Sequence, residues 1–482
     1  MLSIAGTRMR RLGSFVWVAL AAALAASCTR NAPYRTTSTG DVVEAKVGAK
    51  SLGTSALRAP LLTSGIEIHD DYRLHFLEFD DQGQLYSAAQ FHGLVDALEK
   101  EAAGPEKARI VLVLYAHGWK NNASLCNNNV CCFRTFLSRL AADVRTAEKR
   151  SNGFLGPTHV IGVYVGWRGL SATLPPFKAL SFWARKRVAG NVAQGELVEA
   201  LSFLDRYQKH LNKETPNRCR LVMMGHSLGG AVLYSAVANI LKSRITEARV
   251  KGVLDGQVPT IEGFGDLVVL VNPAFEASLY APLHELIETF PAFSPRQSPL
   301  LVVLSSETDT TTRVTFKVGR WLETVFQRTG PRSPRKMLVS TVGNYDPFVT
   351  HRATVPDEAR EKAGGSERGL VKNCECTLPM SEADVGSLDR FVEILRLGPE
   401  ESAKALTPTL CPGHDRLGVV ELDCVAPHPS GLPLWVVRAD NSVVSGHSGF
   451  FTRPVTDLVR NLVARRILEQ MVAPQAPGSG SR

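Results

Sequence analysis

Residues 220–241, RLVMMGHSLGGAVLYSAVANIL, carry the strongest structural signal in the chain. The stretch begins as an apolar strand over residues 220–225 and continues from Leu228 as a helix, and the turn between them fits Gly-x-Ser-x-Gly around Ser227. In this context the glycines let strand and helix approach closely, and the Ser227 hydroxyl is presented at a helix N-terminus, where negative charge is favoured. We interpret Ser227 as a nucleophile; the alternative is a serine that only caps the helix.

On both sides of this element, apolar strand-like segments alternate with segments of helical spacing. The expected strands are 72–79, 109–115, 158–165, 266–272, 299–305 and 433–437, and the expected helices are 133–149, 194–212, 317–327 and 452–471. Alternation of this kind predicts an α/β fold with a mostly parallel sheet and helices on both faces. Such sheets carry their functional sites at the carboxyl ends of the strands.

The composition bounds the class of protein. The chain has 482 residues, 44% hydrophobic and 21% charged, which is globular and excludes wholesale disorder. The 55 Lys and Arg against 46 Asp and Glu are a small basic surplus without a dense basic run, which is poor support for nucleic-acid binding.

Two motifs resemble those of the α/β-hydrolase superfamily, in particular bacterial lipases and esterases. They are Gly225-His-Ser-Leu-Gly-Gly230 and Tyr115-Ala-His-Gly-Trp119, and the resemblance covers about residues 66–472. It implies an α/β-hydrolase fold and an oxyanion hole formed by the backbone N–H groups of Trp119 and Leu228. His117 is expected to be structural.

The segment 163–169, VYVGWRG, is similar to a subset of bacterial and fungal hydrolases. The sequence assigns no role to Trp167 or Arg168.

A serine nucleophile needs a base and an acid that orients the base, in the chain order Ser, acid, His for this superfamily. Asp309 follows strand 299–305 and is the expected acid, with Glu307 as the alternative. Asp266 precedes its strand and therefore lies at the wrong end of the sheet.

His447 is the expected base, because it follows strand 433–437 by a short loop and precedes the last helix, which is the family's position for this residue. His351 is the alternative, and His414 and His428 are less suitable. The long separation between acid and base departs from the family and predicts an insertion over about residues 328–430. It would form a disulfide-braced subdomain, acting either as a lid or as a passive elaboration.

Cysteine usage favours an oxidising compartment. Beyond Cys28 the chain has an even number of cysteines, at positions 126, 131, 132, 219, 374, 376, 411 and 424. Disulfides are expected, zinc ligation lacks the usual spacing, free thiols are a third alternative, and the connectivity stays open.

The N-terminal segment resembles a bacterial lipoprotein signal. Three arginines precede the apolar run 12–26, and Leu24-Ala-Ala-Ser-Cys28 resembles a lipobox, although its leucine stands one position early. We expect a signal peptide over 1–27, a lipid on Cys28, a flexible tether over 28–65 and a disordered tail over 473–482. Thr29 then favours the outer membrane; an ordinary cleaved signal, giving a periplasmic or secreted protein, is the alternative.

Together these features predict a serine ester hydrolase, a carboxylesterase or lipase, that works through an acyl-enzyme with Ser227, Asp309 and His447. No cofactor or metal is expected, and the expected partners are a small-molecule or lipid ester and a membrane, not nucleic acid. The alternatives are a peptidase or amidase on the same fold, and an envelope lipoprotein that uses a hydrolase scaffold only for binding.

Overall fold

The computed structural model describes residues 28–36, 44–47, 64–104, 107–150, 156–175, 177–256, 258–294, 297–359, 370–372, 375–377, 415–425 and 431–472. The predicted signal peptide and C-terminal tail lie outside the described residues. Within the described part no helix is long and apolar enough to cross a membrane.

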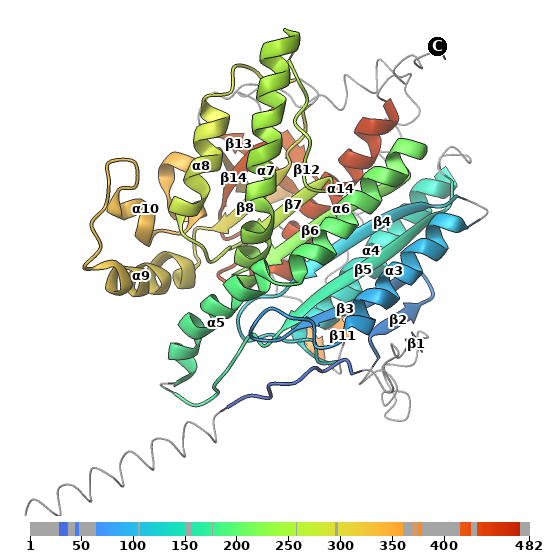
Figure 1. Cartoon of the computed structure of the whole chain (residues 1–482), viewed down its shortest axis with the longest axis horizontal. Helices are drawn as coiled ribbons and strands as arrows, with labels where there is room; N and C mark the ends of the chain where they lie inside the picture. Colours follow the sequence, from blue (N-terminus) through green and yellow to red (C-terminus); the bar gives the residue numbers. More distant parts are fainter. Residues whose placement is uncertain are drawn as a thin grey trace, which may run out of the picture.

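The centre of the molecule is a 12-stranded sheet of order β1-β2-β3-β5-β4-β6-β7-β8-β14-β9-β13-β12 (Figure 1). The run from β3 through β9 in this order is parallel, and antiparallel pairs occur only toward the two sides of the sheet. The expected mostly parallel sheet is therefore confirmed. Its strands are β1 (Glu44–Val47), β2 (Ile66–His69), β3 (Tyr72–Phe79), β4 (Arg109–Ala116), β5 (Thr158–Trp167), β6 (Cys219–His226), β7 (Leu267–Val271), β8 (Leu301–Ser306), β9 (His351–Thr354), β12 (Asp415–Leu417), β13 (Val420–Cys424) and β14 (Leu434–Ala439).

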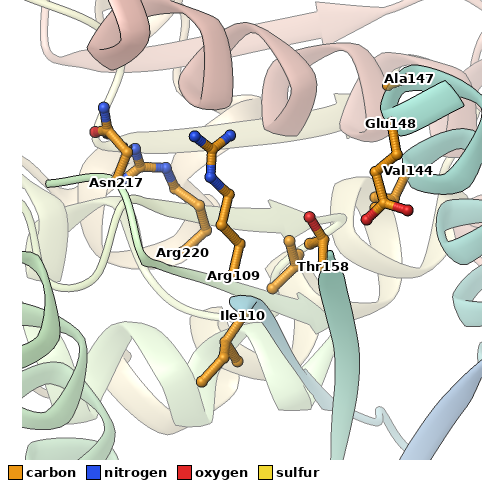
Figure 2. A pocket seen from close by; sticks show the side chains of 9 residues that line it. Arg109, Ile110, Val144, Ala147, Glu148, Thr158, Asn217 and Arg220 are labelled. Atoms are coloured by element: carbon orange, nitrogen blue, oxygen red, sulfur yellow. Dashed lines mark hydrogen bonds between the residues drawn. The ribbon is translucent and has the colours of Figure 1, made fainter. Parts of the chain in front are cut away.

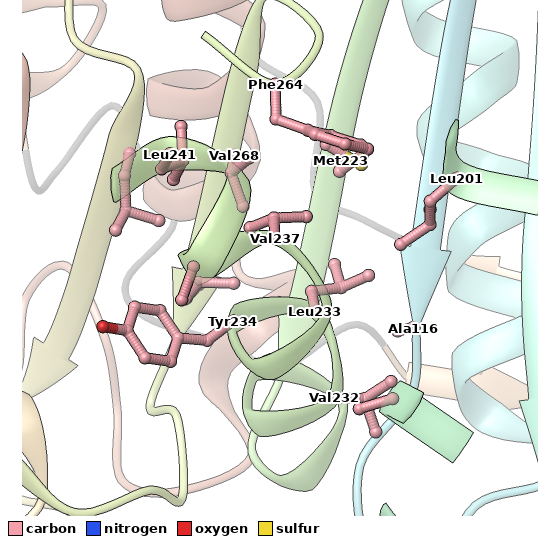
Figure 3. Packing of buried hydrophobic residues seen from close by; sticks show 14 of the residues in the cluster. Ala116, Leu201, Met223, Val232, Leu233, Tyr234, Val237, Leu241, Phe264 and Val268 are labelled. Carbon is pink, nitrogen blue, oxygen red and sulfur yellow. The ribbon is translucent and has the colours of Figure 1, made fainter. Parts of the chain in front are cut away.

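Helices cover both faces of this sheet, because alternate strand side chains point to opposite faces. On β4, Leu112 and Leu114 join a core with α3, α5, α6, α7 and α8, while Val111 and Val113 join a second core with α4 and α14. Figure 3 shows the first core where α7 crosses the sheet. The helices are α3 (Ala88–Ala103), α4 (Asn128–Arg150), α5 (Phe177–Gln194), α6 (Leu197–Glu214), α7 (Leu228–Asp255), α8 (Ala277–Glu288), α9 (Phe316–Thr324), α10 (Arg335–Val339) and α14 (Arg453–Val472).

Part of the predicted insertion extends the central sheet instead of forming a separate subdomain. β9 pairs with β14 in parallel, and β13 and β12 follow it as antiparallel neighbours. A small hairpin of β10 (Leu370–Lys372) and β11 (Glu375–Thr377) lies against α4. The expectation of one separate subdomain over 328–430 is therefore wrong for the strands that join the sheet.

The cysteines divide into two groups. Cys126, Cys132 and Cys424 are disulfide-bonded. Cys131 and Cys219 are free thiols buried in the core, so the pairing suggested by the even count does not extend to them. The other cysteines of the insertion lie outside the described residues or have no described side chain.

The beginning of the predicted tether, residues 28–36, is packed on the domain. Arg35 is fully buried, forms an ion pair with Glu67 at 3.0 Å and stacks over the Phe76 ring at 3.9 Å. Its backbone N–H donates to Glu78 at 2.6 Å. A free tether over all of residues 28–65 is therefore wrong for this segment, since a buried arginine is stable only when paired.

Candidate active site

Ser227 lies at the turn that joins the carboxyl end of β6 to the start of α7. Its backbone has φ 54° and ψ −118°, a conformation that non-glycine residues rarely adopt and that strains the chain. Three backbone hydrogen bonds hold it there: the Ser227 N–H donates to the Val271 carbonyl at 3.0 Å, and the Ser227 carbonyl accepts from the N–H groups of Ala274 at 3.0 Å and Ala231 at 3.2 Å.

The glycines of the motif permit this turn, as the sequence predicted. A Cβ atom on Gly229 would lie 2.1 Å from the Ala116 carbonyl oxygen, and one on Gly225 would lie 2.8 Å from the Gly229 carbonyl oxygen. Side chains at these positions would push the helix away from the strand ends.

The structure brings Ser227, His447 and Asp309 together. His447 Nε2 lies 2.8 Å from Ser227 Oγ, and His447 Nδ1 lies 2.7 Å from Asp309 Oδ2. With Asp309 ionised, Nδ1–H donates to the carboxylate and Nε2 is left to accept the Ser227 hydroxyl proton. The three residues follow β6, β14 and β8, so the parallel sheet itself gathers them at its carboxyl edge.

Asp309 is fully buried and is held by the turn that follows it. Its carboxylate accepts hydrogen bonds from the Thr311 and Thr312 N–H groups at 2.8 and 3.2 Å and from the Thr312 hydroxyl at 2.7 Å. Burial alone would raise the pKa of Asp309, but the hydrogen bonds from His447 and Thr312 and the His447 charge outweigh it, and the net pKa is lowered. The carboxylate is therefore ionised beside the imidazole at neutral pH.

The alternative residues lie elsewhere. Glu307 faces outward, 3.9 Å from Arg352. His351 is buried on β9, where it packs on the Trp435 ring at 4.6 Å. Asp266 sits before β7 at the opposite edge of the sheet, as expected from the sequence. His414 and His428 lie outside the described residues.

Two residues that the sequence analysis did not assign hold the loop that carries His447. His226 Nε2 lies 2.8 Å from the His447 carbonyl oxygen. The Asn272 amide donates to the carbonyls of Gly446 and His447 at 3.0 and 3.1 Å, and Asn272 adopts φ 47°. Burial, and next the nearby His447, lowers the pKa of His226 to about 4, so its ring is neutral.

The loop after β4 lies directly against Ser227. A Cβ atom on Gly118 would lie 2.8 Å from Ser227 Cβ and 2.8 Å from the His226 carbonyl oxygen. No hydrogen bond from the backbone N–H of Trp119 or Leu228 to another described residue is found.

The VYVGWRG segment supports this loop from the neighbouring strand. The Trp167 ring stacks on His117 at 5.4 Å, and its Nε1–H donates to the His117 carbonyl at 3.1 Å. Gly169 exchanges backbone hydrogen bonds with the loop, accepting from Lys120 at 2.9 Å and donating to Asn121 at 3.1 Å. Burial lowers the pKa of His117 to about 4, which fits the structural role expected for it.

The backbone turn after Trp167 is fixed by ion pairs. Arg168 and Arg185 both bind the carboxylate of Asp81. These contacts explain a motif to which the sequence assigned no role: its side chains position the loop beside Ser227. Among the described residues no cluster of His, Cys, Asp and Glu side chains could hold a metal ion.

No protein-family model matches the chain, and no curated protein matches it. A Trichoderma reesei cutinase in complex with a phosphonate inhibitor is 17% identical, with a TM-score of 0.15 over 39% of this chain and 65% of the cutinase. The phospholipase PlaB from Legionella pneumophila, in complex with thio-NAD, is 12% identical, with a TM-score of 0.18 over 42% of this chain and 39% of the phospholipase. Both TM-scores are too low to carry an argument about function.

Proposed function

We propose that this chain is a serine ester hydrolase with an α/β-hydrolase fold, in which Ser227 is the nucleophile, His447 the general base and Asp309 the orienting acid. The observation that supports it most is the hydrogen-bonded series from Asp309 through His447 to Ser227, with distances of 2.7 and 2.8 Å. Distances of this size are those that proton transfer between nucleophile and base requires.

In the proposed reaction the Ser227 oxygen attacks the ester carbonyl while His447 Nε2 takes its proton. The resulting tetrahedral oxyanion accepts hydrogen bonds from the N–H groups of Trp119 and Leu228. Collapse expels the alcohol, which receives the proton from His447, and leaves an acyl group on Ser227. A water molecule then attacks this acyl-enzyme with His447 again as the base, releasing the acid and restoring the Ser227 hydroxyl.

The buried Asp309 carboxylate stabilises the imidazolium that forms in each half of this cycle. The N–H groups of the oxyanion hole point at charge that develops only in the transition state. Donors of this kind contribute roughly 3–4 kcal/mol each to its stabilisation. The strained Ser227 backbone keeps the hydroxyl aimed at this position before substrate arrives.

Esters are proposed ahead of amides because the motifs around Ser227 and Trp119 resemble those of lipases and esterases. Export as an outer-membrane lipoprotein, with the lipid on Cys28, is part of the same proposal. Cys28 is exposed at the start of the described structure, where a lipid would meet no packed core.

The test compares two substrates with the same acyl group, p-nitrophenyl butyrate and butyryl p-nitroanilide, with the purified full-length chain. We expect the ester to be hydrolysed with a burst of p-nitrophenol that equals the enzyme concentration, and the anilide at least 100-fold more slowly. Faster anilide cleavage would make the protein an amidase or peptidase, and hydrolysis of neither would favour a binding protein built on this scaffold.

A further inference from the structure

A row of large apolar side chains is exposed along α9 and its two ends. They recur every three or four residues, so most of them share one side of the helix. We call them the α9 apolar face, and they are Val314 (57% exposed), Val318 (55%), Trp321 (50%), Leu322 (61%), Val325 (38%) and Phe326 (96%). Monomeric proteins rarely leave a contiguous face of this kind in water unless it meets a partner or a membrane.

The opposite side of α9 is fixed to the domain, so the apolar face cannot turn inward. Phe316 is buried and its ring lies 6.0 Å from that of Trp183 on α5. A Cβ atom on Gly319 would lie only 1.8 Å from the Trp183 ring, and Arg320 forms an ion pair with Glu276 at 2.7 Å. The helix is thus pinned by packing and by charge.

The segment that carries the apolar face is rich in basic residues. Residues 311–336 contain one acid, Glu323, against seven basic residues: Arg313, Lys317, Arg320, Arg328, Arg332, Arg335 and Lys336. Lys317 and Arg328 are exposed and form no ion pair with the described residues. A helix with an apolar face flanked by Lys and Arg has the chemistry that binds an anionic lipid surface.

The α9 face also lies at the same edge of the sheet as the catalytic residues and Cys28. The turn that leads into α9 begins two residues after Asp309. Cys28 forms a β-bridge with Ala172, in the loop that leads from the carboxyl end of β5 to α5, the helix that packs on α9. A lipid on Cys28 and the α9 apolar face would therefore meet a membrane from one side of the molecule.

We propose that the α9 apolar face docks on an anionic phospholipid surface, with its side chains in the interfacial layer and Lys317 and Arg328 at the headgroups. Docking would hold the edge that carries Ser227 toward the lipid, so that esters could enter from the membrane. Because residues 28–36 are packed on the domain, the lipid on Cys28 would reinforce this orientation and would not act through a long tether. The docking itself is independent of the chemistry at Ser227.

The test measures sedimentation of the chain from residue 28 onward with Cys28→Ala, which carries neither the lipid nor the apolar run 12–26, with phosphatidylglycerol vesicles and with phosphatidylcholine vesicles. We expect binding to phosphatidylglycerol, and at least tenfold weaker binding after the double change Val318→Asp and Leu322→Asp. A second variant, Lys317→Gln with Arg328→Gln, should weaken binding to phosphatidylglycerol and leave the weaker binding to phosphatidylcholine unaltered.

The matched control is Val253→Asp with Leu254→Asp. These side chains are 73% and 77% exposed at the far end of α7, which runs from Ser227 toward the opposite edge of the sheet (Figure 1). The control should bind vesicles as the parent does. Melting followed by circular dichroism should show that all three double variants are folded.

Three results would overturn the proposal: no vesicle binding by the Cys28→Ala parent, equal binding by the α9 variant, or a parent that is dimeric while the α9 variant is monomeric. The last result would make the face a contact between copies of the chain. Hydrolysis of p-nitrophenyl butyrate by the parent, measured separately, reports the proposed function and is not part of the binding readout.

Discussion

At the amino edge of the sheet Arg220 pairs with Asp266 at 3.4 Å, whereas at the carboxyl edge Asp309 pairs with His447, which in turn reaches Ser227. The amino edge also carries a pocket lined by Arg109, Glu148 and Arg220 (Figure 2). Both edges thus have buried carboxylates and basic partners, and this pocket lies at the edge away from Ser227.

The two edges differ in the residues that the hydrogen bonds of each carboxylate connect. Asp266 accepts hydrogen bonds from the Leu221 N–H and the Gln208 amide, so its interactions tie strand and helix ends together. At the carboxyl edge the series ends in the hydroxyl of Ser227, whose backbone has the strained φ of 54°. The carboxylate at the amino edge ties elements of the fold together, and the carboxylate at the carboxyl edge holds the imidazole that reaches the proposed nucleophile.

The largest expected difference is between alanine substitutions of two histidines, one in the proposed site and one packed in the sheet. His447→Ala should lower kcat by about 10⁶-fold, because Ser227 loses its base. His351→Ala, which removes a ring packed on Trp435, should leave kcat of the folded fraction unchanged while lowering the melting temperature. If His351→Ala were inactive and His447→Ala active, the assignment of His447 as the base would be wrong.

The two buried aspartates, Asp309 and Asp266, allow the same comparison. Asp309→Asn should lower kcat by about 10⁴-fold, because the amide NH2 group can donate to Nδ1 and select the wrong tautomer of His447, and because the neutral amide does not stabilise the imidazolium. Asp266→Asn should lower stability through its contacts with Leu221 and Gln208 and spare kcat. Steady-state kinetics on p-nitrophenyl butyrate decide between them, and equal losses of kcat would remove the distinction between the edges.

Each edge also has one asparagine with positive φ, at 47° for Asn272 and 66° for Asn217. Glycine adopts such angles freely, so a change to glycine removes the side chain without adding strain. Asn272→Gly should lower kcat about 10²-fold with little change in KM, because the His447 loop loses its two hydrogen bonds. Asn217→Gly should change neither kcat nor KM. If Asn272→Gly raised KM and left kcat unchanged, Asn272 would not act by positioning His447.

The smallest expected effect concerns stability and pH. His117 and His226 have pKa values lowered from 6.5 to about 4 by burial, so the unfolded chain takes up protons in this interval and the folded protein does not. Stability is therefore fully present above about pH 6.5 and is lost as the pH falls toward 4, by up to about 3 kcal/mol for each residue.

Urea denaturation at pH 7.5 and at pH 5.0 measures this loss. His226→Gln should reduce the difference between the two pH values, and the exposed His210→Gln should not. A wild-type stability that is equal at both pH values would contradict the buried, neutral state of these rings.

Much of the site could be predicted from the sequence because it depends on local signals. The glycines around Ser227, and the positions of Asp309 and His447 just after apolar strands, fix their places once the sheet is parallel. The roles of Asn272 and Trp167 could not be predicted, since they depend on contacts between strands that only the folded sheet brings together.

The packing of residues 28–36 was missed for a similar reason. The composition of this segment resembles that of a tether. Its ordered structure depends on the ion pair between Arg35 and Glu67, two residues that are far apart in the sequence. Strand β9 could not be predicted because it has only four residues, and its pairing with β14 depends on the tertiary structure.

Labelling of the wild-type chain with a fluorophosphonate, followed by mass spectrometry of its peptides, would identify the nucleophilic residue. The reagent forms a covalent bond only with a serine that an adjacent base has activated. We predict stoichiometric labelling of Ser227 in the wild-type protein and no labelling of Ser227→Ala. Ser235 is an exposed serine on α7, and the control variant Ser235→Ala should be labelled to the same extent as the wild type. An unlabelled wild-type protein, or an adduct on another residue, would contradict the account.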